Sequence, residues 1–415
     1  MTPASTTTTA LAWHARPGVL ARFVADLIAD EVSHLRPGGL PLPERPWPLD
    51  LPLDEAGLGL DSLERLAVAS ALNEALHLHE SGIEDLLLAR RQFGEWIDVA
   101  ASGLAAFDAR LTFRTSGSSG RAKPCTHTLA SLQQEVGHLA TLTAGAQRVL
   151  AAVPAHHIYG FLFTVLLPAR LGIETVLDVR RHTPQGLAQA MRRGDLLVSH
   201  PAHWTLVARH SEPLPAGAHG VTSTAPCPDG LALDLQALGL ASLTQVYGSS
   251  ETAGIGTRSA AGAPYRLMPF WSRGAADGGV LMRTSPDGTL SPHAIQDRLE
   301  WPLAREFKVC GRLDDAVQVG GTNVFPSRVR QVLLEHPQVA DAAVRLMAPG
   351  EGSRLKAFVV PAPGVHAETL RHELWAWSDA RLSAPSRPKA YTLGECLPRN
   401  AMGKLADWPL AQQVA

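Results

Sequence analysis

Cysteine is scarce in this sequence, with four residues in 415, and the four lie far apart along the chain. No two of them have the spacing of a metal-ligand pair, so we predict reduced thiols in a cytoplasmic protein. Net charge is also small, at −2 from 37 basic and 39 acidic side chains. We therefore expect neither nucleic acid nor an anionic membrane surface as a partner.

Long apolar runs are missing as well. The longest stretch, residues 159–167, is too short to span a bilayer, so we expect no membrane segment. The N-terminus begins MTPASTTTTALAWHARPG and has no basic region followed by an apolar core, which argues against a secretory signal. Residues 1–16 contain a threonine run with little to bury, and we expect them to be disordered.

Short apolar runs alternate with amphipathic segments after residue 110, which predicts an α/β fold with a mostly parallel sheet and helices on both faces. A hydrophobic content of 45% is ample for buried cores. The predicted strands are residues 111–114, 149–153, 174–179, 196–199 and 243–246, and the predicted helices are 130–142, 186–193 and 202–210.

The pattern changes near residue 313. Residues 265–290, before this point, indicate a small β structure. The segment 313–415 predicts a small α+β domain of three strands and two helices. Its predicted strands are residues 317–319, 339–346 and 355–360, and its predicted helices are 326–334 and 367–382.

Residues 111–123 have the sequence LTFRTSGSSGRAK, a short apolar run followed by a Ser/Gly loop and Lys123. Hydroxyl groups and backbone N–H groups exposed by glycine suit a polyphosphate. The loop is not a Walker A motif, because Gly120 is followed by Arg121 and not by lysine. Taken alone, this stretch is equally well explained as a flexible linker.

Four further motifs follow in order, and they are PAHHIYG at 154–160, VYGSSET at 246–252, GRLDD at 311–315 with GGTNVFP at 320–326, and PRNAMGKL at 398–405. Together the five resemble the adenylate-forming superfamily of acyl- and aryl-CoA synthetases, luciferases and peptide-synthetase adenylation domains. This resemblance implies an AMP-binding core domain at residues 106–312, shortened at its N-terminus, and a mobile C-terminal lid domain at 313–415.

The resemblance implies that a carboxylic acid attacks the α-phosphorus of ATP, a reaction in which cations and oriented dipoles must neutralise phosphate charge. It places Mg²⁺ on Glu251 and the catalytic ammonium on Lys404. His157 would gate or line the carboxylate pocket, although a packed core histidine is an equal alternative. The residues implied to bind ATP or AMP are Thr115, Ser116, Gly117, Ser118, Ser119, Gly120, Lys123, Tyr247, Gly248, Ser250, Asp297 and Arg312.

A second half-reaction, in which a thiol attacks the acyl-adenylate, is also implied. The lid would rotate about the hinge Asp314 and replace the Lys404 face by Gly320 and Gly321, which leave room for a pantetheine arm. No cysteine is placed as an obvious nucleophile, so coenzyme A or the phosphopantetheine of a carrier protein would supply the thiol.

The helical segment at residues 17–105 resembles an acyl carrier protein. It contains predicted helices at 19–35, 62–76 and 83–100, and carriers attach phosphopantetheine at the serine that Ser62 matches. The alternative is an ordinary capping box formed by Asp61 and Glu64. Superfamily members normally have a larger N-terminal subdomain than the 110 residues that precede the Ser/Gly loop here. In this chain that subdomain is either reduced or partly replaced by a carrier-like module.

The sequence carries one indication of the substrate class. The stretch 156–163 has no aspartate to hold an α-amino group, which favours an aryl or unsaturated acyl acid over an amino acid. Phe161, Phe163 and Trp204 would line an apolar pocket or belong to the core. Two other functions stay open: a ligase that acylates its own Ser62 arm, and a degenerate AMP-binding scaffold protein.

Overall fold

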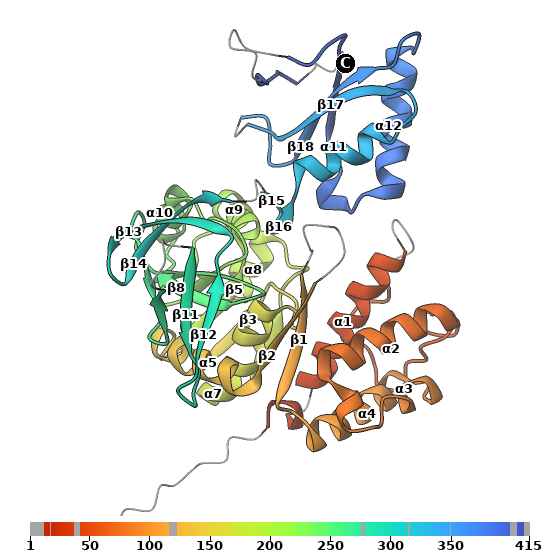
Figure 1. Cartoon of the computed structure of the whole chain (residues 1–415). Coiled ribbons are helices and arrows are strands. Elements are labelled where there is room, and N and C mark those ends of the chain that lie inside the picture. Colours follow the sequence, from red (N-terminus) through yellow and green to blue (C-terminus); the bar gives the residue numbers. More distant parts are fainter. Residues whose placement is uncertain are drawn as a thin grey trace, which may run out of the picture. The chain divides into compact units, whose positions relative to one another are not determined.

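A computed structural model describes residues 12–16, 18–36, 42–115, 123–274, 279–313, 316–348, 350–398 and 405–410. The chain divides into two compact units (Figure 1). Unit 1 consists of Met1–Thr115, Lys123–Ile295 and Leu299–Val309, and unit 2 consists of Ser116–Ala122, Gln296–Arg298 and Cys310–Ala415. None of the helices in the described part of the chain is long and apolar enough to cross a membrane.

A nine-stranded sheet organises unit 1, with the strand order β13-β14-β9-β8-β7-β6-β5-β3-β4. The strands from β7 to β4 are parallel, and β8, β9 and β14 continue the sheet in antiparallel pairs. This arrangement confirms the predicted α/β class. The strands are β3(Arg148–Ala151), β4(Val176–Asp178), β5(Asp195–Ser199), β6(His219–Thr222), β7(Ser242–Ser249), β8(Ala253–Arg258), β9(Tyr265–Leu267), β13(Asp297–Leu303) and β14(Glu306–Arg312).

Hydrophobic cores cover both faces of this sheet because successive side chains of a strand point to opposite sides. In β5, Leu197 belongs to one core, and Leu196 and Val198 belong to the other. The Leu197 core includes side chains of α8(Pro184–Ala190), α9(Pro201–His210) and α10(Asp229–Ala237). The opposite core includes side chains of α5(Leu129–Leu142) and of the helical run α6(Ile158–Phe161), η3(Leu162–Leu166) and α7(Leu167–Leu171).

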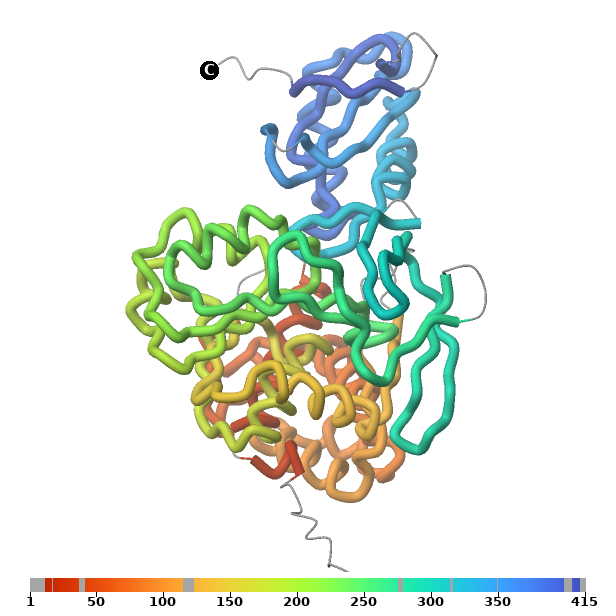
Figure 2. Tube along the Cα trace, turned by 90° about the vertical axis from the view of Figure 1, so that its left-hand side faces the viewer, coloured from red at the N-terminus to blue at the C-terminus, as the bar shows by residue number. Residues whose placement is uncertain are grey.

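The N-terminal helices share this second core. Trp13 and Phe23 pack against Phe161, with ring centroids 5.0 Å and 5.8 Å away. Figure 2 shows these helices, in red and orange, beside the yellow segment that contains α5. The helices are η1(Trp13–Ala15), α1(Val19–Leu35), α2(Ser62–Leu76), η2(Leu78–Glu80), α3(Leu86–Ala89) and α4(Phe93–Ala106). The segment that resembles a carrier protein therefore packs as part of unit 1.

Two details of this segment differ from prediction. The predicted helix at 83–100 is two helices, because Glu95 accepts hydrogen bonds from the backbone N–H groups of Arg91 and Gln92 and so caps α4. Residues 1–11 of the segment predicted to be disordered lie outside the described residues. Trp13, in the same segment, is buried in η1, so the prediction extended too far.

The first predicted strand of the core does not join the parallel sheet. β1(Arg110–Thr115) pairs antiparallel with β2(Lys123–Thr128) in a separate two-stranded sheet. This pairing was not predicted, because β2, KPCTHT, contains no apolar run. A three-stranded antiparallel sheet follows later in unit 1, formed by β10(Trp271–Arg273), β11(Val280–Thr284) and β12(Leu290–Ala294).

Unit 2 has its own small core. A β hairpin precedes a three-stranded sheet of order β17-β18-β19, and Val329, Leu333, Leu370 and Leu374 from two helices pack with the sheet. The elements are β15(Val317–Val319), β16(Thr322–Val324), α11(Pro326–Leu334), β17(Val339–Leu346), β18(Leu355–Pro361), α12(Ala367–Arg381), η4(Ala384–Ser386) and β19(Ala390–Leu393). The predicted elements are present, and β16, η4 and β19 are additions.

Candidate active site

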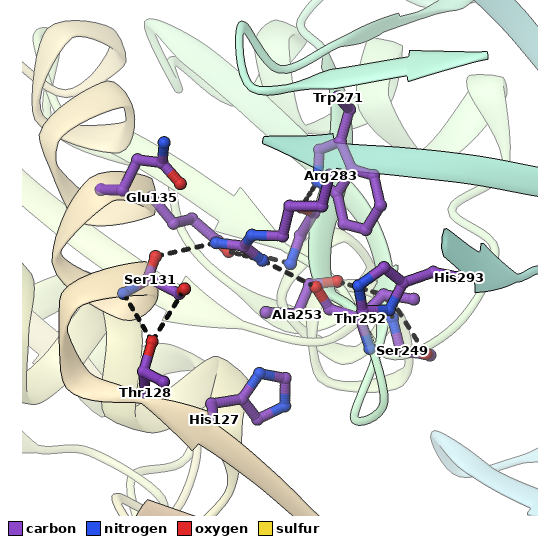
Figure 3. A network of polar contacts seen from close by, with 12 residues as sticks. His127, Thr128, Ser131, Glu135, Ser249, Thr252, Ala253, Trp271, Arg283 and His293 are labelled. Carbon is purple, nitrogen blue, oxygen red and sulfur yellow. Dashed lines mark hydrogen bonds and ion pairs between the residues drawn. The ribbon is translucent and has the colours of Figure 1, made fainter. Parts of the chain in front are cut away.

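The predicted metal ligand Glu251 lies in the turn between β7 and β8, which we call the Glu251 turn (residues 249–252). Hydrogen bonds within the turn hold its shape (Figure 3). The Thr252 hydroxyl donates to the Ala253 carbonyl at 2.9 Å and accepts from the Ser249 N–H at 3.1 Å. The side chain of Glu251 stays exposed. The turn is therefore a preformed support for one accessible carboxylate.

Close backbone approach and an unusual torsion mark both ends of this turn. A Cβ atom on Gly248 would lie 2.1 Å from the Ala253 carbonyl oxygen, so only glycine fits there. Ala253 has φ 57°, a left-handed value that is rare for a residue with a side chain. Such strained positions persist where surrounding contacts enforce them, and they are common at functional sites.

Those surrounding contacts come from a buried polar network (Figure 3). Arg283 of β11 donates to the carbonyl oxygens of Thr252 at 3.1 Å and of Ser131 at 2.8 Å. Glu135 of α5 accepts from the backbone N–H of Gly254 at 2.9 Å. Complete burial raises the pKa of Glu135 to about 8, against the opposing effect of Arg283.

His127 is a member of the site that sequence reasoning missed. Its Nε2 atom lies 2.7 Å from the carbonyl oxygen of Ser250 and so links β2 to the Glu251 turn. Burial lowers the pKa of His127, which favours a neutral ring that donates this hydrogen bond. The predicted nucleotide residue Ser250 thus has its backbone held by a buried imidazole.

The charges of Lys123 and Glu251 both influence the pKa of the Cys125 thiol. Burial, and then the charge of Glu251, raise the pKa of the Cys125 thiol to about 11, and Lys123 opposes them. The three side chains therefore lie in one neighbourhood at the start of β2. A thiol with this pKa is protonated at neutral pH and is a poor nucleophile.

The residues present fit a magnesium ion at Glu251. Mg²⁺ takes one or two carboxylates from a protein and completes its shell with water and phosphate oxygens. Glu251 offers one exposed carboxylate. The hydroxyl group of the neighbouring Thr252 already makes hydrogen bonds within the turn, so we do not assign it as a metal ligand. One exposed carboxylate therefore meets the requirement of this ion for a protein ligand.

Tyr247, predicted to contact adenine, lies in a group of aromatic rings. Its ring centroid is 5.2 Å from that of Phe307 and 5.8 Å from that of Tyr265. Phe307 and Tyr265 stack at 5.6 Å, and the Arg258 guanidinium lies 4.9 Å from the centre of the Tyr265 ring. Because Tyr247 is only half-buried, part of its side chain stays accessible beside Gly248.

His157 directly precedes α6, in the loop that follows β3. The residue keeps exposed surface, which favours the pocket role over a packed core histidine. Desolvation by surrounding protein and the neighbouring His156 lower the pKa of His157 to about 4, which leaves a neutral imidazole. Three proposed pocket residues, by contrast, are fully buried in the two cores: Phe161, Phe163 and Trp204.

In unit 2 the structure brings together two residues predicted to bind the nucleotide. Arg312 Nη1 lies 3.7 Å from Asp297 Oδ1. The predicted thiol path, Gly320 and Gly321, forms the two-residue loop of the β15–β16 hairpin, with φ of 59° and 84°. Positive φ at both positions is typical of a type I′ turn, which explains the glycines structurally. Their role in admitting a thiol arm stays a prediction.

Several predicted residues cannot be placed. Ser116, Gly117, Ser118, Ser119, Gly120, Asp314 and Lys404 lie outside the described residues, as does the side chain of Thr115. Ser62 is the first residue of α2, and the Asp61 and Glu64 side chains beside it form a complete capping box. The pattern that resembled a carrier thus has a structural explanation, and the carrier resemblance is not confirmed.

The fold is an α/β domain followed by a small C-terminal α+β domain. Residues 72–273 match the sequence profile of the AMP-binding enzyme, and residues 329–404 match that of the AMP-binding enzyme C-terminal domain. The chain belongs to the AMP-binding enzyme family. The motif-based prediction of an ATP-dependent, AMP-forming ligase that transfers a carboxylic acid to a thiol is confirmed at this level.

Curated relatives cover most of the chain. A protein named 4-coumarate–CoA ligase from Halorhodospira halophila is 42% identical over 361 residues, which are 86% of this chain and 90% of the relative. A protein of the same name from Rhodobacter capsulatus is 40% identical over 376 residues, 88% of this chain and 94% of the relative.

Solved structures support the fold. An amide bond synthetase from Marinactinospora thermotolerans matches with TM-score 0.58 and 18% identity, covering 93% of this chain and 92% of that one. A malonyl-CoA ligase matches with TM-score 0.56 and 22% identity, covering 70% of this chain and 71% of that one. At such identities the likeness concerns the fold alone.

Proposed function

We propose that this protein is a CoA ligase for an aryl-substituted unsaturated acid of the 4-coumarate type. The observation that carries the proposal is the identity of 40–42% with proteins named 4-coumarate–CoA ligase over almost the whole chain. In the first step the carboxylate would attack the α-phosphorus of ATP and displace pyrophosphate. In the second, the thiol of coenzyme A would attack the acyl carbon, forming the thioester and releasing AMP.

In the first step the chain must hold a polyanion close to a second anion. We assign Glu251 to Mg²⁺, which would neutralise phosphate charge when bound. Lys404 would bridge the acid carboxylate and the α-phosphate, where the two negative charges meet. Lys123 and the hydroxyl groups of the Ser/Gly loop would hold the remaining phosphates. The Glu251 turn needs no rearrangement for this, because its hydrogen bonds are already made.

Asp297 would accept hydrogen bonds from the ribose hydroxyls, and Arg312, 3.7 Å away, would orient that carboxylate or contact a phosphate. The accessible part of Tyr247 would lie along the base. His157, neutral and exposed, would donate to or accept from the carboxylate of the acid without adding charge.

The proposal is tested by measuring CoA-thioester and AMP formation with a panel of acids. The panel contains 4-coumarate, cinnamate, 3-(4-hydroxyphenyl)propanoate, benzoate and a medium-chain fatty acid. We expect 4-coumarate or cinnamate to have a kcat/KM at least about tenfold above the saturated analogue, which corresponds to about 1.4 kcal/mol in the transition state. Equal or better use of the fatty acid or benzoate would contradict the assigned substrate class.

A further inference from the structure

Helix α1 and the loop after β3 bring together three side chains that can ligate a metal ion. Asp30 comes from α1, and His156 and His157 come from the loop. One ligand atom from each lies within 4.8 Å of the other two. The two imidazole rings are adjacent, with centroids 4.2 Å apart. We call these three residues the imidazole cluster.

Among the described residues, Asp30 is the one polar partner of the His156 ring. The side chain is only 10% exposed, Nδ1 has no hydrogen-bond partner, and Nε2 has a single long contact with Asp30. Buried polar atoms without a partner are rare in folded proteins, and one common explanation is a bound ion. Nε2 of His156 faces the Asp30 carboxylate at 3.5 Å, which is longer than an ordinary N–H···O hydrogen bond.

That separation fits two ligands of one ion. Ligand atoms about 2.0–2.1 Å from a tetrahedral Zn²⁺ lie about 3.3 Å from one another. Two imidazoles and one carboxylate suit Zn²⁺ and other first-row transition metals, whereas Mg²⁺ and Ca²⁺ prefer oxygen ligands. The ligand set therefore differs in kind from that of Glu251.

Contacts of Asp26, which lies on the same helix as Asp30, support the imidazole cluster. Asp26, one turn before Asp30 on α1, accepts a hydrogen bond at 2.7 Å from the backbone N–H of Ala155. Arg45 and Arg180 pair with the other oxygen of Asp26 at 2.5 Å and 2.8 Å. These ion pairs on the buried Asp26 fix the backbone that leads into His156, which reduces the cost of ordering the ligands when an ion binds.

A second group of potential ligands offers a contrast. His77, His79 and Glu80 also come within 4.8 Å of one another, but each already has a partner. His77 Nε2 contacts the Thr112 hydroxyl at 2.9 Å, His79 Nδ1 contacts Asn73 at 3.3 Å, and Glu80 pairs with Arg110 at 2.5 Å. Each of these side chains has at least one protein partner without a metal, so this group serves as a matched control.

We propose that Asp30, His156 and His157 form a binding site for a first-row transition-metal ion such as Zn²⁺. A bound ion would occupy the imidazole of His157, and this consequence rests on the proposed function, in which His157 contacts the acid. Transition-metal ions at this site would then inhibit the ligase reversibly and independently of Mg²⁺.

Binding is tested on the full chain without nucleotide, by competition of the protein with a chromophoric chelator for Zn²⁺. We expect one Zn²⁺ per chain, and Asp30→Asn and His156→Gln should each weaken its affinity about tenfold or more, because each removes one ligand. His79→Gln should leave the affinity unchanged. Circular dichroism and unfolding curves show that each variant is folded, and Co²⁺ provides a spectroscopic check of coordination.

Three outcomes would overturn the site: no stoichiometric Zn²⁺ binding by the parent protein, binding unaffected by Asp30→Asn and His156→Gln, or an equal loss in His79→Gln. Inhibition is measured separately, as thioester formation with excess Mg²⁺ and increasing Zn²⁺. Inhibition should be reversed by a zinc-selective chelator and should require more Zn²⁺ in Asp30→Asn. Binding without inhibition would overturn the regulatory consequence, and the binding result stands even where no acid is a substrate.

Discussion

Arg283 donates a hydrogen bond at 3.1 Å to the carbonyl oxygen of Thr252, the residue that follows Glu251. The guanidinium is buried, and it also donates to Ser131 in α5. It therefore connects the Glu251 turn to a helix that follows the Ser/Gly loop in the chain. Buried Arg283 therefore helps to fix the backbone that positions Glu251, the proposed metal ligand.

Arg283→Met should destabilise the protein by about 2–4 kcal/mol, because it removes the side-chain donor from the carbonyl group of the buried Thr252 and the cationic neighbour of Glu135. The free energy of unfolding in urea measures this. Arg209→Met, at the exposed end of α9, should change it by less than about 0.5 kcal/mol. A loss below 1 kcal/mol for Arg283→Met would contradict the proposed support of the turn.

Glu135→Gln should change how stability depends on pH. Because burial raises the pKa of Glu135 from 4.5 to about 8, the folded protein holds one more proton than the unfolded chain between these values. This stabilising contribution is complete below pH 4.5 and is lost as the pH rises through 8. Glutamine cannot ionise, so the variant should gain stability relative to the parent as pH rises, by at most about 1.4 kcal/mol per unit.

Urea unfolding of both proteins between pH 5 and pH 9 measures this difference, and parallel curves would show that Glu135 keeps an ordinary pKa.

Gly248→Ala should disrupt the Glu251 turn, because the added Cβ would lie 2.1 Å from the Ala253 carbonyl oxygen. We expect a loss of stability of more than about 2 kcal/mol. Gly137→Ala is the matched control: Gly137 lies in α5, a Cβ there meets nothing within 4 Å, and alanine should stabilise the helix by about 0.5–1 kcal/mol. Thermal unfolding of the two variants should show shifts of opposite sign.

The capping box at α2 predicts different effects for two neighbouring residues. Asp61→Ala removes the side chain that accepts from the Glu64 N–H at 2.8 Å, so it should cost about 1 kcal/mol. Ser62→Ala leaves the cap intact and should keep both stability and CoA-thioester formation. If Ser62→Ala abolished thioester formation, Ser62 would be an acceptor after all. Intact mass after treatment with a phosphopantetheinyl transferase provides an independent check.

Much of the fold was predictable because its elements have simple periodicity. Helix α1 was predicted at residues 19–35 from apolar positions at helical spacing, and the structure has the same bounds. β6 was missed because HGVT contains a histidine and a glycine and is too short to form an apolar run. β1 was assigned to the wrong sheet because pairing with β2 is a long-range property that a single strand does not encode.

The motif identified the Glu251 turn but not what supports it. Glu135 and Arg283 are distant in sequence, and each is an ionisable side chain within an otherwise apolar face, Glu135 next to Val136 in α5 and Arg283 in β11. An ionisable side chain at such a position indicates a buried polar network, and this signal could have been used to predict the support of the Glu251 turn. His127 gave no comparable signal, because nothing in β2 indicates that its ring faces residue 250.

The most direct test of the proposed chemistry separates the two half-reactions in the parent protein and in Lys404→Ala. ATP–pyrophosphate exchange with 4-coumarate reports adenylation, and thioester formation from the preformed acyl-adenylate and coenzyme A reports thiol transfer. We predict exchange in the parent, a loss of at least about 100-fold in the variant, and thiol transfer retained in both, because the ammonium is required only where carboxylate meets phosphate. Undiminished exchange in Lys404→Ala, or no exchange in the parent with any aryl or acyl acid, would contradict the account.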